Sequence, residues 1–116
     1  MNAAMEIAGD SQRDGLLDFI DGVLYYREGA AKRFPHDMRN QEGIDQLKDL
    51  RKHVEAMPSD APIFRLMALE HDSDHAFSAR LSDWLGRRLT RMGSEFDSTP
   101  SMFLGDLREF VTAKGE

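Results

Sequence analysis

The chain contains no cysteine, and its 116 residues include only one tryptophan and two tyrosines. The absence of cysteine excludes a disulfide framework, a thiolate metal site and cysteine nucleophilic chemistry. No window holds about 18 consecutive apolar residues, so the sequence predicts neither a membrane-spanning helix nor a membrane partner. Residues 1–9 lack the order of basic and then apolar residues that is typical of a signal peptide, which leads us to expect a cytoplasmic protein.

Sequence motifs of common enzyme classes are also missing. The chain has no glycine-rich phosphate loop of the GxxxxGK[ST] or GxGxxG type, and no GxSxG, HExxH or calcium-loop pattern. Without cysteine or a dense Ser/His/Asp constellation, hydrolytic chemistry has little support. We therefore expect no catalytic activity of the chain's own.

Acidic residues outnumber basic ones, 21 Asp and Glu against 15 Lys and Arg, which gives a formal net charge of −6. A protein whose main role is nucleic-acid binding usually carries a basic surface, so nucleic acid is a disfavoured partner. An acidic surface suits a basic protein partner instead.

Apolar residues recur at helical spacing in four segments, over residues 11–34, 44–57, 63–92 and 99–111. A chain of this length forms one domain. We predict an all-α fold, a small single-domain bundle of four or five mostly antiparallel helices over residues 11–116, preceded by a flexible lead-in at residues 1–10. The expected core comprises the apolar residues on the inner stripes: Leu16, Phe19, Ile20, Val23, Leu47, Leu50, Val54, Phe64, Met67, Phe77, Leu81, Trp84, Leu85, Phe103, Leu107, Phe110 and Val111.

One alternative concerns Asp21 and Gly22, which lie between two apolar runs as in a β-hairpin turn. Neither run alternates cleanly between apolar and polar residues, and an isolated two-stranded hairpin is marginally stable. A helix is therefore favoured here.

A single helix over residues 63–92 would be about 45 Å long, which is long for so small a bundle. It would also place the carboxylates of Glu70 and Asp74 within its apolar stripe. We therefore expect a break near residues 71–74, with Asp72 or Ser73 capping the helix that follows.

The alternative to a break is a buried polar cluster. Arg27 lies within the apolar stripe of the first segment, and Arg88, Glu70 and Asp74 would all lie within that of the segment over residues 63–92. Acids are rarely buried unless paired, so these four residues are candidates for a buried ion-pair cluster, serving either structure or a site with shifted pKa values.

The same segment holds two histidines four residues apart, His71 and His75. On one helix they would share a face, the spacing of paired imidazole metal ligands, and Glu70 or Asp74 could complete a site for a divalent metal. Solvated histidines are the simpler interpretation. No ExxH motif of the ferritin-like di-iron type occurs in the chain.

A short repeat spans residues 14–34, where an acid followed by glycine opens each of three heptads. On a helix, Gly15, Gly22 and Gly29 form one narrow stripe that drifts by only about 20° per heptad. Each interior glycine costs about 1 kcal/mol relative to alanine, so the stripe indicates close approach by another helix of the bundle or by a partner chain. The neighbouring Tyr25 and Tyr26 favour a contact surface. A solvated face is the alternative.

Arg80, Arg87 and Arg91 share one side of the third segment, away from its apolar stripe. Such a row could bind phosphates or an acidic partner, although a solvated charged face is the ordinary explanation.

Together these patterns favour a protein-interaction or regulatory module, such as an adaptor, an inhibitor or antitoxin, or a regulatory subunit. Its partner would be another protein or a second copy of the chain, meeting it at the glycine stripe. A metal-binding bundle and a nucleic-acid-associated protein are the alternatives. We expect no cofactor other than the divalent metal of the first alternative.

Overall fold

The computed structural model describes residues 3–92 and 99–113, and every element in this part of the chain is an α-helix. The predicted all-α fold is confirmed, with five helices in a single globule. These are α1 (Ala3–Arg33), α2 (Met38–Glu55), α3 (Pro62–Ser73), α4 (His75–Thr90) and α5 (Pro100–Thr112).

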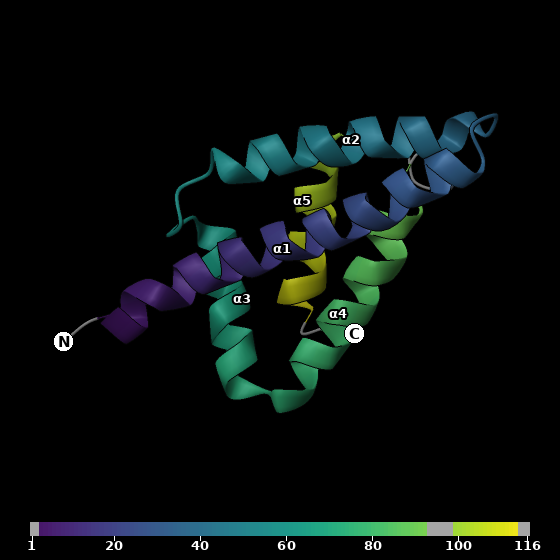
Figure 1. The fold of residues 1–116 in the computed structure, drawn as a ribbon. Coiled ribbons are helices and arrows are strands. Elements are labelled where there is room, and N and C mark those ends of the chain that lie inside the picture. The colour runs from purple at the N-terminus through teal and green to yellow at the C-terminus, as the bar shows by residue number, and fades with distance from the viewer. Residues whose placement is uncertain (1–2, 93–98, 114–116) are drawn as a thin grey trace.

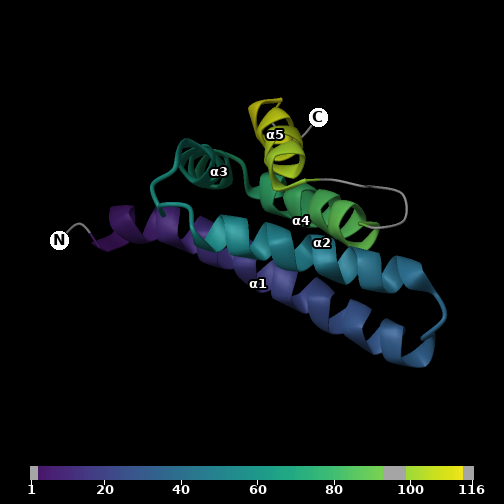
Figure 2. The same cartoon turned by 90° about the horizontal axis from the view of Figure 1, so that it is seen from above.

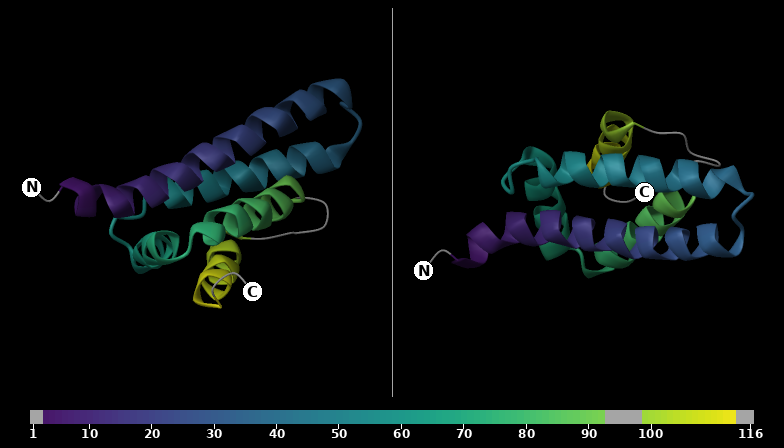
Figure 3. Two further views of the ribbon diagram at one scale, coloured as in Figure 1. Left: turned by 90° about the horizontal axis from the view of Figure 1, so that it is seen from below. Right: turned by 45° about the horizontal axis from the view of Figure 1, so that its top comes forward.

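The helices form two layers. α1 and α2 run antiparallel as a long hairpin, and α3, α4 and α5 pack on one side of it (Figures 1 and 2). α3 and α4 diverge from the bend between them like the arms of a V, and both contact α1. α5 contacts α2 and α3 and lies farthest from α1 (Figure 3).

The first helix is longer than predicted. It begins at Ala3 rather than Ser11, so most of the expected lead-in at residues 1–10 is helical. Alanine, methionine and glutamate dominate this stretch, and all three are strong helix formers. The helix also runs through Asp21 and Gly22, which excludes the hairpin turn considered there.

The predicted break in the third segment is confirmed, one residue later than the proposed caps. Asp74, rather than Asp72 or Ser73, separates α3 from α4, and its extended backbone ends one helix and starts the next. Its carboxylate accepts a hydrogen bond from the Ala76 amide at 2.9 Å, which satisfies one unpaired donor in the first turn of α4.

The core lies between the two layers. Fourteen residues of the predicted core are buried, whereas Phe19, Trp84 and Phe110 are only partly buried. The Trp84 ring lies 5.2 Å from the Phe110 ring and joins α4 to α5. Sequence analysis omitted several residues that the structure buries: Leu24, Ala30, Ile44, Ala61, Ile63, Ala68, Leu89 and Met92. Within the described chain, no helix has both the length and the apolarity needed to cross a membrane.

A buried arginine joins three segments at one end of the core. Arg27 is 5% exposed, and its guanidinium donates hydrogen bonds to the carbonyl oxygens of Thr90 and Arg39. Thr90 ends α4, where unpaired carbonyls and the negative end of the helix dipole favour a cation. Burial lowers the pKa of Arg27, which records the cost of placing this charge away from water.

Candidate functional site

The glycine stripe of α1 lies on the molecular surface. A Cβ atom added at Gly15 or Gly22 would meet no atom within 4 Å, and one at Gly29 would meet only the Arg33 guanidinium, at 3.5 Å. No other described helix therefore packs on this stripe, which leaves contact with a partner chain or the solvated face that was the alternative. We call Gly15, Gly22 and Gly29, with Tyr25, the glycine face.

The two tyrosines beside the stripe are strongly exposed. Tyr25 has 82% of its surface open to solvent and Tyr26 has 61%. Tyrosine is enriched at protein interfaces because it combines a large apolar ring with a polar tip. The exposed tyrosine rings protrude from this surface, and the neighbouring glycines, which have no side chains, leave recesses in it.

Three shallow hollows follow the stripe along α1. The first includes Gly15, the second Gly22 and the third Gly29. Phe19 lines the first and second hollows, and Tyr26 lines the second and third, so that the hollows adjoin. They form one groove, which we call the α1 groove.

The opposite wall of the first two hollows comes from α4, and sequence analysis did not identify it. Small residues recur there at four-residue spacing, as Ser78, Ser82, Gly86 and Thr90. Ser78 and Ser82 line the first hollow, Thr90 lines the second, and a Cβ at Gly86 would lie 3.9 Å from the Phe19 ring. Small side chains at this spacing keep one helix face low, which leaves room for an approaching side chain.

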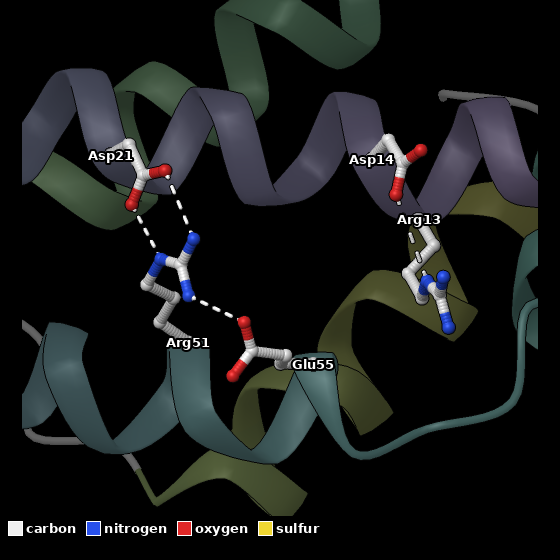
Figure 4. A network of polar contacts seen from close by, with 5 residues as sticks. All are labelled: Arg13, Asp14, Asp21, Arg51 and Glu55. Carbon is white, nitrogen blue, oxygen red and sulfur yellow. Dashed lines mark hydrogen bonds and ion pairs between the residues drawn. The ribbon is translucent and has the colours of Figure 1, made fainter.

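Ion pairs hold α1 against α2 beside this surface. Arg51 of α2 donates from its Nε to Asp21 of α1 at 2.5 Å and from its Nη1 to Glu55 at 3.0 Å (Figure 4). The hydrogen bond from Arg51 lowers the pKa of Asp21. Arg13 lies 3.7 Å from Asp14 and donates to the Met57 carbonyl oxygen at 3.0 Å. These contacts orient α1 without occupying the glycine face.

The proposed histidine metal site loses its geometric basis, because the break at Asp74 puts His71 on α3 and His75 on α4. The two residues therefore do not belong to one helix, and the i, i+4 spacing no longer implies a shared face. His71 is exposed, and its Nδ1 forms a hydrogen bond with the Ser78 hydroxyl at the edge of the first hollow. Among the residues whose side chains are described, which exclude His75, no three His, Asp or Glu side chains are grouped to hold a metal, so Glu70 and Asp74 complete no such site there.

The predicted cluster of Arg27, Glu70, Asp74 and Arg88 is wrong. Both arginines are buried as expected, but neither meets the two acids. Arg88 donates to Asp106 of α5 at 2.5 Å and lies over the Phe103 ring, whereas Asp74 pairs with Arg80 at 2.8 Å. Because the helix breaks at Asp74, the acids leave the apolar stripe on which the cluster depended.

The arginine row on α4 is largely compensated by nearby carboxylates. Arg80 pairs with Asp74, and Arg87 pairs with Asp83 at 3.3 Å. Arg91 caps the end of α4. The row therefore does not present three uncompensated cations to a phosphate backbone.

A bidentate ion pair shapes the turn between α1 and α2. Asp37 caps α2, its two carboxylate oxygens accepting hydrogen bonds from the Arg39 Nε at 2.9 Å and from the Arg39 Nη2 at 2.8 Å. These bonds favour the ionised carboxylate and lower the pKa of Asp37 to about 2.

We expect an NMR pH titration to place the Asp37 midpoint near pH 2. Since this pKa lies below the unfolded value of 3.8, the contribution of Asp37 to stability is present above that value and is lost as the pH falls from 3.8 towards 2. Arg39→Gln should raise the Asp37 midpoint. Arg51→Gln, which removes a partner of Asp21, should leave it unchanged, and an equal shift in both variants would argue against the pairing.

Comparison with protein families, with curated proteins and with solved structures yields no match for this chain.

Proposed function

We propose that this protein is a protein-interaction module that acts through its surface, in an adaptor, inhibitor or regulatory role, and has no catalysis of its own. The observation that carries the proposal is the glycine face: a helix surface with open space at its glycines and exposed tyrosines beside them. Interior glycines reduce helix stability, so a solvated face gains nothing from three of them in register. Close packing against a partner helix would compensate for the helix stability that the glycines cost.

A second copy of the chain fits this face. Gly22 and Tyr25 are three residues apart and lie on the same face of α1. In an antiparallel pair with its two-fold axis between these positions, each Tyr25 ring would pack over the Gly22 of the other copy. Such an interface is isologous, because each copy supplies both the protruding ring and the recess.

The charges along α1 favour the same orientation. Asp14 and Asp18 lie towards the first half of the glycine face, and Lys32 and Arg33 lie towards its other end. Antiparallel pairing brings the acids of one copy near the bases of the other, whereas parallel pairing would place like charges together. The proposed assembly is therefore an antiparallel homodimer through α1.

Gly22→Leu should weaken this assembly by about tenfold or more in the dissociation constant, because the leucine side chain would occupy the space of the partner's Tyr25 ring. The substitution should leave each subunit folded, since Gly22 has open space within its own chain. Sedimentation equilibrium over a range of protein concentrations measures the effect.

Gly105→Leu is the matched control. Gly105 lies in α5 with open space around it, so both substitutions add the same side chain to an exposed helical glycine. The control should self-associate as the wild type does. A wild-type chain that stays monomeric at high concentration, or an equal loss in both variants, would contradict the proposal.

A further inference from the structure

The turn that joins α1 to α2 projects from one end of the molecule. The hairpin extends beyond α3, α4 and α5 at this end, so the turn is the outermost part of the long axis (Figures 2 and 3). The molecule measures 51 Å along that axis and 28 and 21 Å across it. We call residues 32–39 the hairpin tip.

Two large apolar side chains at the hairpin tip are open to solvent. Phe34, directly after α1, is 60% exposed, and Met38, the first residue of α2, is 63% exposed. Neither belongs to the core nor to the residues packed against it. Pro35 between them is also exposed. The chain thus presents an apolar pair at the projecting end of the α1–α2 hairpin, outside the core.

Cations surround this apolar pair. Lys32 and Arg33 are exposed and make no ion pair with any residue that the structure describes. The only acid of the tip, Asp37, is bound by both arms of the Arg39 guanidinium. Three bases and one acid give residues 32–39 a formal charge of +2, in a chain whose total is −6.

We propose, against the expectation from the sequence that there is no membrane partner, that the hairpin tip binds an anionic lipid surface, with Phe34 and Met38 entering the headgroup region and Lys32 and Arg33 contacting the lipid phosphates. Apolar residues with flanking cations are the combination by which peripheral proteins attach to membranes. Phe34 and Met38 lie outside the glycine face, whereas Lys32 and Arg33 serve both proposals, so the apolar pair is the part of the tip that is tested separately from the dimer.

The shape of the molecule makes this contact compatible with its acidic total charge. At physiological salt, charges interact over about 8 Å. Glu28 lies one turn, about 5.4 Å, behind Lys32 on α1, and Glu42 lies as far behind Met38 on α2, so these two acids offset part of the charge of the tip. A projecting tip meets the surface first, and acids two or more turns further along α1 and α2 lie beyond the screening distance.

The full chain should float with vesicles of equal parts phosphatidylglycerol and phosphatidylcholine, and should not float with pure phosphatidylcholine. Phe34→Ser with Met38→Ser should lower the bound fraction by about tenfold, because this change removes the apolar contact. Lys32→Glu with Arg33→Glu should lower it by a similar factor. Raising the salt to about 1 M, where the screening length is about 3 Å, should release the wild-type protein.

Matched controls separate the tip from general effects. Leu69→Ser with Met102→Ser removes two exposed apolar residues of α3 and α5, and Lys48→Glu with Lys52→Glu changes the charge of α2 by the same amount. Both should bind vesicles as the wild type does, and so should Gly22→Leu, which tests the dimer alone. Absence of wild-type binding to anionic vesicles, as a tip made for a protein partner would show, overturns the inference. Equal losses in tip and control variants also overturn it.

Discussion

Replacing Gly43 by alanine should destabilise the protein by about 2 kcal/mol or more, although alanine is the better helix former. A Cβ atom at this position would lie 2.2 Å from Nη2 of Arg27 and 2.5 Å from the Met92 carbonyl oxygen. The first neighbour belongs to a side chain held by two hydrogen bonds, and the second to the backbone of a fully buried residue. Neither can move aside cheaply, so the strain exceeds the gain of about 1 kcal/mol in helix propensity.

The reason for this crowding lies in the helical hydrogen-bond pattern. Arg27 Nη2 donates to the Arg39 carbonyl oxygen at 2.7 Å. Residue 43 is the ordinary helical partner of that carbonyl, four residues further along α2. A guanidinium that reaches the Arg39 carbonyl from the core therefore occupies the place of a side chain at position 43.

Urea unfolding followed by circular dichroism measures the change in stability, with Gly105→Ala as the control. Gly105 has open space around it, so alanine there should stabilise the protein by about 0.5–1 kcal/mol through helix propensity and reduced chain entropy. Opposite signs for the same substitution would confirm the packing at Gly43. If both variants gained stability, that packing would be wrong.

Most of the fold could be predicted from the sequence because its signals are local. Proline, capping residues and the spacing of apolar residues located the helices. The break between α3 and α4 could be predicted because an unbroken helix would have placed the Asp74 carboxylate within an apolar stripe. The start of α1 was missed because residues 3–10 have high helix propensity but show no amphipathic stripe.

The candidate site could be predicted only in part. The heptad repeat placed Gly15, Gly22 and Gly29 on one face, but whether another helix covers that face depends on how α3 and α4 pack, which no local pattern determines. The α4 wall of the groove carried a usable signal, the four-residue spacing of Ser78 and Ser82 that continues to Thr90. The buried cluster was wrong, and the metal site lost the single-helix spacing on which it rested, for one shared reason: both assumed an unbroken helix through Asp74.

Arg27 shows another limit of sequence reasoning. Its position within an apolar stripe correctly predicted a buried cation, yet the predicted acidic partners were wrong. Its actual acceptors are backbone carbonyls of Thr90 and Arg39. Every residue has a backbone carbonyl, so the sequence does not indicate which carbonyl accepts the hydrogen bond. A carboxylate partner, by contrast, is visible in the sequence as Asp or Glu.

Arg27→Ala should accordingly cost about 3 kcal/mol of stability. The Thr90 and Arg39 carbonyl oxygens lose a charge-assisted donor, and a hydrogen bond to a charged group contributes about 1.5–3 kcal/mol. Removal of the aliphatic part of the side chain adds a packing loss. Relief of the guanidinium's desolvation, which its lowered pKa records, offsets part of the total. Arg51→Ala, which removes a partly exposed ion pair, should cost less than about 1 kcal/mol when measured in the same way.

A double-mutant cycle of Arg27→Ala and Gly43→Ala then separates the steric from the polar contribution. If the guanidinium is the main obstacle at position 43, Gly43→Ala should cost at least about 1 kcal/mol less in the Arg27→Ala background than in the wild type. The relief should be incomplete, because the Met92 carbonyl oxygen would still lie 2.5 Å from the added Cβ. If the two losses of stability were strictly additive, the Met92 carbonyl oxygen alone would cause the cost of Gly43→Ala. If Arg27→Ala removed that cost completely, the Arg27 guanidinium alone would cause it. Either result would contradict our interpretation that the Arg27 side chain and the Met92 backbone together require glycine at position 43.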